Sequence, residues 1–271
     1  MIMTNINDNQ VKEIAPKKDI VMVNNDALAP VLDNINTVTD LDIWLVCVEI
    51  FNHQIEDMKG QLKDHQTVVP SSNAKQTVTI SAKQINRALN KTIKTSRIVQ
   101  AMTKIEDFIL MASSTANIKI IPTGQKLHNE WEYEVTLYSD SVYLKGQIFT
   151  LNIANFLHFK KKNQKKTYLA MCKYSTRGTL LLNEESWITT LYGSKTPVRV
   201  SLAKWKQELS EMNKAWSEHF DKDLIKRAFI DHDGRLVMVF RKSLLKKTLF
   251  QRIIQKEPEG QFFIIDGKFI G

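Results

Sequence analysis

The chain has 271 residues, 43% of them hydrophobic, and this length suits two globular domains of ordinary size. Its net charge of +9 at pH 7 favours a polyanionic partner. No apolar run approaches the roughly 18 residues of a membrane span, and the first residues do not resemble a signal peptide, so we expect a cytoplasmic protein without membrane contact. The two cysteines, Cys47 and Cys172, have no ligand-like spacing and are expected to be reduced core residues.

The chain begins with a polar stretch. Residues 1–36 are rich in Asn and Asp and weakly periodic, which predicts a flexible N-terminal arm with at most a short ordered piece. Asp40 can cap a helix that runs to about Met58, because apolar residues recur there at helical spacing. We expect a first domain at residues 37–159 and a second at residues 160–271.

One pattern occurs twice, about a hundred residues apart: a short strand, a polar cap, a short helix, a tight turn and a longer helix. In the first copy, a β-branched strand at 77–80 leads to Ser81 and to helices at 82–89 and 96–111. Ser81 and Gln84 fit a capping box, in which each side chain satisfies a free backbone amide of the other residue. The first copy therefore predicts a helix–turn–helix unit behind a strand.

The second copy repeats this order in the second domain. Its strand at 179–182 leads to the cap Asn183 and to helices at 184–191 and 198–216. The longer helix of each copy has an apolar stripe that is expected to face the core. Further elements are expected as a strand at 142–151, helices at 153–159, 167–174 and 242–254, and a hairpin at 262–270.

A β-hairpin is predicted behind each helix–turn–helix. Its strands are expected at 117–121 and 131–137 in the first domain, and at 225–230 and 235–240 in the second. A helix–turn–helix followed by a hairpin wing is the winged-helix arrangement, whose second helix commonly enters the DNA major groove. The predicted fold is therefore α+β, with two tandem winged-helix domains.

The basic charge is concentrated in particular segments. Residues 75–104 hold seven basic residues and no acidic one, and this window coincides with the first helix–turn–helix. Residues 159–271 carry a net charge of +11, while residues 1–158 carry −2. Five lysines lie among residues 160–166, where a solvated hinge and a phosphate contact are equally open interpretations. Basic charge at a helix–turn–helix predicts binding to double-stranded DNA, because phosphate contacts release condensed counterions.

Candidate DNA contacts follow from the predicted long helices and turns. Arg can pair bidentately with guanine and Gln with adenine, so residues around the start of each long helix are expected to read base edges. These residues are Ser96, Arg97, Gln100, Thr196 and Arg199. Basic residues in the turns, on the helices and at the second hairpin are expected to contact phosphates. These residues are Lys91, Lys94, Lys104, Lys195, Lys204, Lys206 and Arg235.

Motifs for catalysis and cofactor binding are missing from the sequence. It contains no glycine-rich phosphate loop, and its six histidines are scattered without the spacing of a metal site. Asp-x-Asp pairs such as Asp40 with Asp42 fall at predicted helix starts or turns, where carboxylates cap the backbone and are solvated. We therefore expect a binding protein that is not an enzyme and that holds no metal and no cofactor.

Segments spread over residues 41–242 carry a family resemblance, and they are 41–51, 81–111, 142–152, 167–174 and 233–240. In their order they resemble the plasmid replication initiators built from two tandem winged helices, the Rep/RepC-like group that binds iterons. The resemblance implies binding to the direct repeats of a plasmid origin, local melting of that origin and recruitment of the replicative helicase or its loader. It also implies an equilibrium between monomer and dimer. The open alternative is a transcriptional regulator of a phage or plasmid with two winged helices, which is expected to prefer a palindrome.

Overall fold

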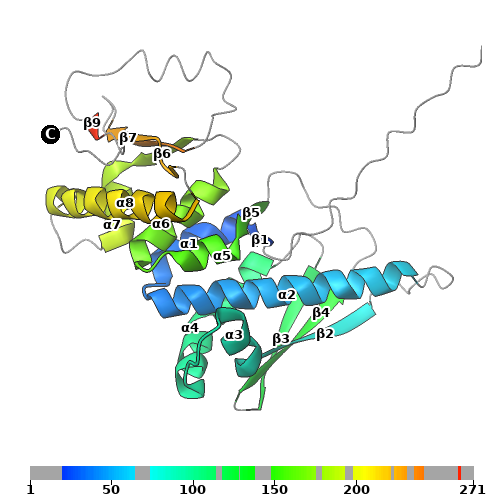
Figure 1. The fold of residues 1–271 in the computed structure, drawn as a ribbon. Coiled ribbons are helices and arrows are strands. Elements are labelled where there is room, and N and C mark those ends of the chain that lie inside the picture. The colour runs from blue at the N-terminus through cyan, green and yellow to red at the C-terminus, as the bar shows by residue number, and fades with distance from the viewer. Residues whose placement is uncertain are drawn as a thin grey trace, which may run out of the picture.

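The computed structural model describes residues 20–64, 74–113, 118–127, 129–137, 148–174, 179–192, 198–220, 223–230, 235–240 and 262–263. These residues form an α+β fold in which helices pack against small antiparallel sheets (Figure 1). The sheets have two, three and four strands. The α+β class predicted from the sequence is therefore confirmed. Within these ranges, no helix is both long and apolar enough to cross a membrane.

The arm predicted at residues 1–36 is wrong for its second part. Strand β1 (Ile20–Asn24), the 3-10 helix η1 (Asn25–Ala27) and helix α1 (Leu28–Asn34) are ordered there, and residues 1–19 lie outside the described ranges. Strand β1 pairs antiparallel with β5 (Ile148–Asn152). Apolar side chains that alternate along β1 are buried, among them Val21. This segment is therefore part of the hydrophobic core, within the first half of the chain (residues 20–159; residues 160–263 are the second half).

Helix α2 (Val38–Asp64) is the longest helix described, and in Figure 1 it lies between the elements of residues 74–137, below it, and the other described elements, above it. It runs past the predicted end at Met58. The hydroxyl of Thr37 accepts a hydrogen bond from the Asp40 amide at 3.0 Å, so Thr37 caps this helix and Asp40 lies in its first turn. The expectation that Asp40 is the cap is therefore wrong by one turn.

The first repeat follows α2. It consists of β2 (Ala74–Ser81), α3 (Ala82–Leu89), α4 (Thr95–Ser113), β3 (Ile118–Leu127) and β4 (Glu130–Leu137). Strands β3 and β4 form a hairpin, and β2 pairs with β4, so the sheet order is β2-β4-β3. The predicted strand, helices and hairpin are confirmed in this order.

The second repeat has the same connectivity. It follows helix α6 (Lys162–Lys173) and consists of β6 (Thr179–Asn183), α7 (Glu184–Tyr192), α8 (Val198–Phe220), β7 (Arg227–Ile230) and β8 (Arg235–Val239). Strand β6 pairs with β8, as β2 pairs with β4, and a short strand β9 (Phe262–Phe263) adds to β7. Each repeat is thus a strand, two helices and a hairpin whose second strand pairs with the first strand of the repeat, and a helix precedes each repeat.

The strand-to-helix turn is capped in the same way in both repeats. The Ser81 hydroxyl accepts from the backbone amide of Gln84 at 3.2 Å, and Oε1 of the Gln84 side chain accepts from the backbone amide of Ser81 at 2.8 Å. In the second repeat, Asn183 Oδ1 accepts from the Ser186 amide at 2.9 Å. Both caps predicted from the sequence are confirmed, and they end each strand where its helix begins.

The apolar stripes of the long helices form the cores of the two halves. On α4 the predicted stripe is buried, and it consists of Ile98, Met102, Ile105 and Ile109. On α8 the described part of the predicted stripe is buried, and it consists of Trp205, Leu209, Met212 and Trp216. Cys47 and Cys172 are buried free thiols, as expected.

Other predicted elements have mixed outcomes. Helix α5 (Ile153–His158) lies where a helix was predicted, and β5 is the end of the strand predicted at 142–151. The helix predicted at 242–254 and most of the hairpin predicted at 262–270 lie outside the described residues.

Candidate nucleic-acid interface

The turn between α3 and α4 is fixed by two asparagines. The Asn86 side chain accepts from the Ile93 amide at 2.8 Å and donates to the Ile93 carbonyl at 3.1 Å. Asn90 ends α3 in the left-handed conformation, with φ of 48°, which Asn tolerates better than most residues. These contacts set the direction in which α4 leaves the turn. The first turn of α4 is therefore held at a defined angle to α3.

The start of α4 carries an accessible polar face. The side chains of Ser96, Gln100 and Lys104 are exposed, on the side away from the buried stripe, and Lys94 is exposed just before the helix. Ser96 and Gln100 were predicted to contact base edges, and Lys94 and Lys104 to contact phosphates. Helix α4 lies below α2 in the view of Figure 1. This arrangement leaves a basic and hydrogen-bonding surface available to a polyanion.

Arg97 differs from its neighbours because it is engaged by α2. Its Nη2 lies 2.5 Å from Asp40 Oδ1 and 3.4 Å from Thr37 Oγ1. The Asp40 side chain is only 5% exposed, whereas that of Arg97 is 32% exposed. The arginine predicted to read a base edge is therefore anchored at one nitrogen and still reaches the surface.

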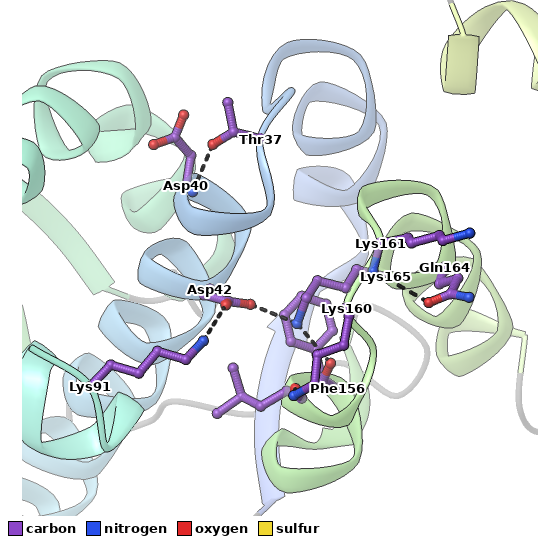
Figure 2. Close-up of polar contacts among 10 residues, drawn as sticks. Thr37, Asp40, Asp42, Lys91, Phe156, Lys160, Lys161, Gln164 and Lys165 are labelled. Carbon is purple, nitrogen blue, oxygen red and sulfur yellow. Dashed lines mark hydrogen bonds and ion pairs between the residues drawn. The ribbon is translucent and has the colours of Figure 1, made fainter. Parts of the chain in front are cut away.

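Asp42 joins three elements of the structure. Lys91, in the turn before α4, has its Nζ 3.4 Å from Asp42 Oδ2, and Lys165 on α6 has its Nζ 2.6 Å from Asp42 Oδ1. Figure 2 shows the two ammonium groups meeting the carboxylate from opposite sides. Lys91 is 55% exposed, while Lys165 and Asp42 are buried. A predicted phosphate contact and the junction between the halves therefore share one carboxylate.

The ammonium group of Lys165 is enclosed by further partners. It donates to the Phe156 carbonyl at 2.9 Å and lies 4.2 Å from the centre of the Phe156 ring. Burial lowers the pKa of Lys165 to about 8, while Asp42 acts in the opposite direction. Helix α6 is thereby fixed to α2 by a buried ion pair.

The solvated hinge that was one interpretation of residues 160–166 is wrong for most of this segment. Lys165 and Lys166 are fully buried, and the Lys166 ammonium donates to the Leu32 carbonyl and, at 3.2 Å, to Asn36 Oδ1. Lys161 forms an ion pair with Glu211 of α8. Helix α6 already begins at Lys162, five residues before the predicted start at 167. Lys165 and Lys166 therefore connect the halves and are not free to contact phosphate, whereas Lys160 and Lys161 are exposed.

The candidate contacts of the second repeat are described in part. Lys204 is exposed, with its Nζ 5.4 Å from the centre of the Tyr192 ring, and Arg235 is exposed at the start of β8. Lys206 is half-buried, and burial lowers its pKa, with Glu184 acting in the opposite direction.

Three candidates have no described side chain. Lys195 and Thr196 lie outside the described residues. Arg199 lies in the first turn of α8, where only the backbone is described. The structure therefore brings together the candidates of the first repeat, and it leaves the assignments at the start of α8 as predictions.

Sequence reasoning missed the two carboxylates that organise the first site. Asp40 and Asp42 were expected to be solvated at a helix start, but both are buried and paired with cations. A signal was present, because Leu41 and Ile43 flank Asp42 in an otherwise apolar run. Carboxylates in such a run must either be paired or remain neutral.

In the ranges that the structure describes, no group of three His, Cys, Asp or Glu residues is placed to hold a metal ion. No protein-family model matches the chain, and no curated protein matches it.

Proposed function

We propose that each repeat is a winged helix and that the chain binds double-stranded DNA through both. The observation that carries this proposal is the connectivity shared by the two repeats: a strand, two helices joined by a tight turn, and a hairpin whose second strand pairs with the first strand. In helix–turn–helix proteins the second helix places its N-terminal residues against base edges. Helices α4 and α8 hold that position in the two repeats.

The surface chemistry of the first repeat supports the same function. The segment from Lys75 to Lys104 has no acidic residue, and the described side chains at the start of α4 are polar, basic and exposed. Amide donors at the start of a helix add to the attraction for phosphate. Base readout then falls to Ser96, Arg97 and Gln100, and phosphate contact to Lys91, Lys94 and Lys104.

Within this class, we propose a plasmid replication initiator that acts in the cytoplasm on the direct repeats of an origin, melts it locally and recruits the replicative helicase or its loader. The support is the resemblance to the Rep/RepC-like group and the presence of two different units in one chain. Two linked units raise each other's effective concentration, so avidity can exceed either affinity by roughly 10²–10⁴. A transcriptional regulator is distinguished by its target, because it prefers a palindrome bound by a dimer.

Two substitutions in α4 test the assignment of roles. Duplexes enriched from a randomised pool by the purified chain supply a specific probe, and a scrambled duplex supplies a non-specific one. Arg97→Ala is expected to cost about 1–3 kcal/mol of specific binding and to relax the preference at one base pair. Lys104→Ala is expected to weaken binding to both duplexes equally, because it removes a phosphate contact. Titration at fixed salt measures both.

The comparison has a clear negative outcome. If Arg97→Ala and Lys104→Ala each change the affinities for the specific and the scrambled duplex in the same proportion, base readout by Arg97 is rejected. If no duplex is enriched from the randomised pool, sequence-specific binding itself is rejected.

A further inference from the structure

Asp40 is placed behind Arg97 in a way that fixes the arginine without covering it. Its backbone amide donates to Thr37 Oγ1, and its side chain is 5% exposed, so the carboxylate is enclosed by the protein at the start of α2. It holds Arg97 at Nη2 from the protein side. Arg97 is thus held at one guanidinium nitrogen, Nη2, by a buried carboxylate.

A guanidinium has five N–H donors in a planar fork, and a bidentate contact to guanine uses two of them. Among the described residues, Asp40 and Thr37 bond only Nη2 of Arg97. The remaining donors are left for a partner, and the side chain is 32% exposed. A fixed arginine also loses less conformational freedom on binding than a mobile one.

We propose that Asp40 is a positioning residue that orients the Arg97 guanidinium for base recognition and thereby sets the sequence preference of the first repeat. This inference rests on the proposed function of α4. The inference goes beyond the proposed function because it assigns a role in sequence specificity to Asp40, a residue of α2 that is not expected to contact DNA. Asp40 acts through Arg97, so its effect is confined to the contact that Arg97 makes.

The sign of the expected effects separates this role from two simpler ones. A carboxylate that only competes with phosphate for Arg97 weakens binding to every duplex, and its removal strengthens binding to every duplex. A carboxylate that only stabilises the fold lowers both affinities in proportion when it is removed. A positioning carboxylate instead lowers specific binding when removed, while non-specific binding stays the same or rises because a negative charge has gone.

The test uses the full chain, the duplex enriched by the wild type and its scrambled form, at fixed salt. Asp40→Asn is expected to reduce the ratio of specific to non-specific affinity about tenfold, within the range of one bidentate base contact. In an Arg97→Ala background, Asp40→Asn is expected to change this ratio no further, because the two residues act as one unit. Asp107→Asn removes an exposed carboxylate from α4 and serves as a charge-matched control that leaves the ratio unchanged.

Thermal unfolding of each variant shows whether it is folded at the assay temperature. If Asp40→Asn is not folded, Asp40→Glu keeps the charge but moves it by one methylene group, and a reduced ratio is expected there as well. An unchanged ratio, an equal rise for both duplexes, or an additive effect in the Arg97→Ala background overturns the inference while leaving DNA binding intact. If the wild type itself shows no sequence preference, the proposed function and this inference both fail.

Discussion

Replacing Lys165 with Met is expected to lower the free energy of unfolding of the chain by about 3–5 kcal/mol, the usual effect of removing one partner from a buried ion pair. Met resembles Lys in volume but has no charge. Asp42 would then remain buried with Lys91 as its cation, 3.4 Å away and 55% exposed. Urea unfolding of the purified variant and of the wild type measures the difference.

Lys166 provides the matched control for this prediction. It neighbours Lys165 on the same helix and is equally buried, but its ammonium meets the Leu32 carbonyl and Asn36, not a carboxylate. Lys166→Met therefore leaves no buried carboxylate unpaired and is expected to lower the free energy of unfolding by clearly less than Lys165→Met does. The double variant Asp42→Asn with Lys165→Met is expected to recover part of the loss. Equal costs for Lys165→Met and Lys166→Met would show that the Asp42 pair does not hold the junction.

Raising the salt concentration from about 50 mM to about 200 mM is expected to weaken binding to the enriched duplex by about 10³-fold or more, as for a protein that makes about six to ten phosphate contacts. The reason is that each cation at a phosphate releases condensed counterions, and the predicted contacts span both repeats. Titrations at several salt concentrations give the slope of log affinity against log salt.

Two lysines refine the salt prediction. Lys104 is exposed, so Lys104→Ala is expected to reduce the slope by about 1. Lys91→Ala is expected to reduce it by less, because Asp42 already offsets the charge of Lys91. A slope near zero for the wild type would contradict phosphate contact altogether. A larger reduction of the slope in Lys91→Ala than in Lys104→Ala would contradict the role given to Asp42.

Elements with local signals were predictable from the sequence. The capping box of Ser81 and Gln84 involves residues three apart, so the bounds of α3 were predicted as observed. The apolar stripes of α4 and α8 also repeat at short range, and they predicted which faces are buried. The doubling of strand, helices and hairpin followed from these local patterns.

Elements that depend on distant partners were not predictable in the same way. Strand β1 pairs with β5 from the far end of the first half, and its polar surroundings hid the short alternation around Val21. The run of lysines at 160–166 has the composition of a solvated segment. However, Lys165 falls in helical phase with the buried residues Tyr168 and Leu169, and this phase was the available signal for a buried cation.

In the candidate site, too, features with local signals were predictable and contacts with distant partners were not. The exposed residues of α4 followed from its helical period, whereas the ion pairs of Arg97 and Lys91 required knowing that the start of α2 packs near the start of α4. Pairing between residues so distant in sequence has no local pattern. The carboxylates Asp40 and Asp42 were therefore visible as residues but not as partners.

A hydroxyl-radical footprint of the full chain on the enriched duplex shows whether both repeats of one chain bind the same duplex. We expect two protected blocks separated by about one helical turn, roughly 10 base pairs, within a site that is not a palindrome. A single protected block, or two symmetric half-sites each covered by a separate chain, would contradict it.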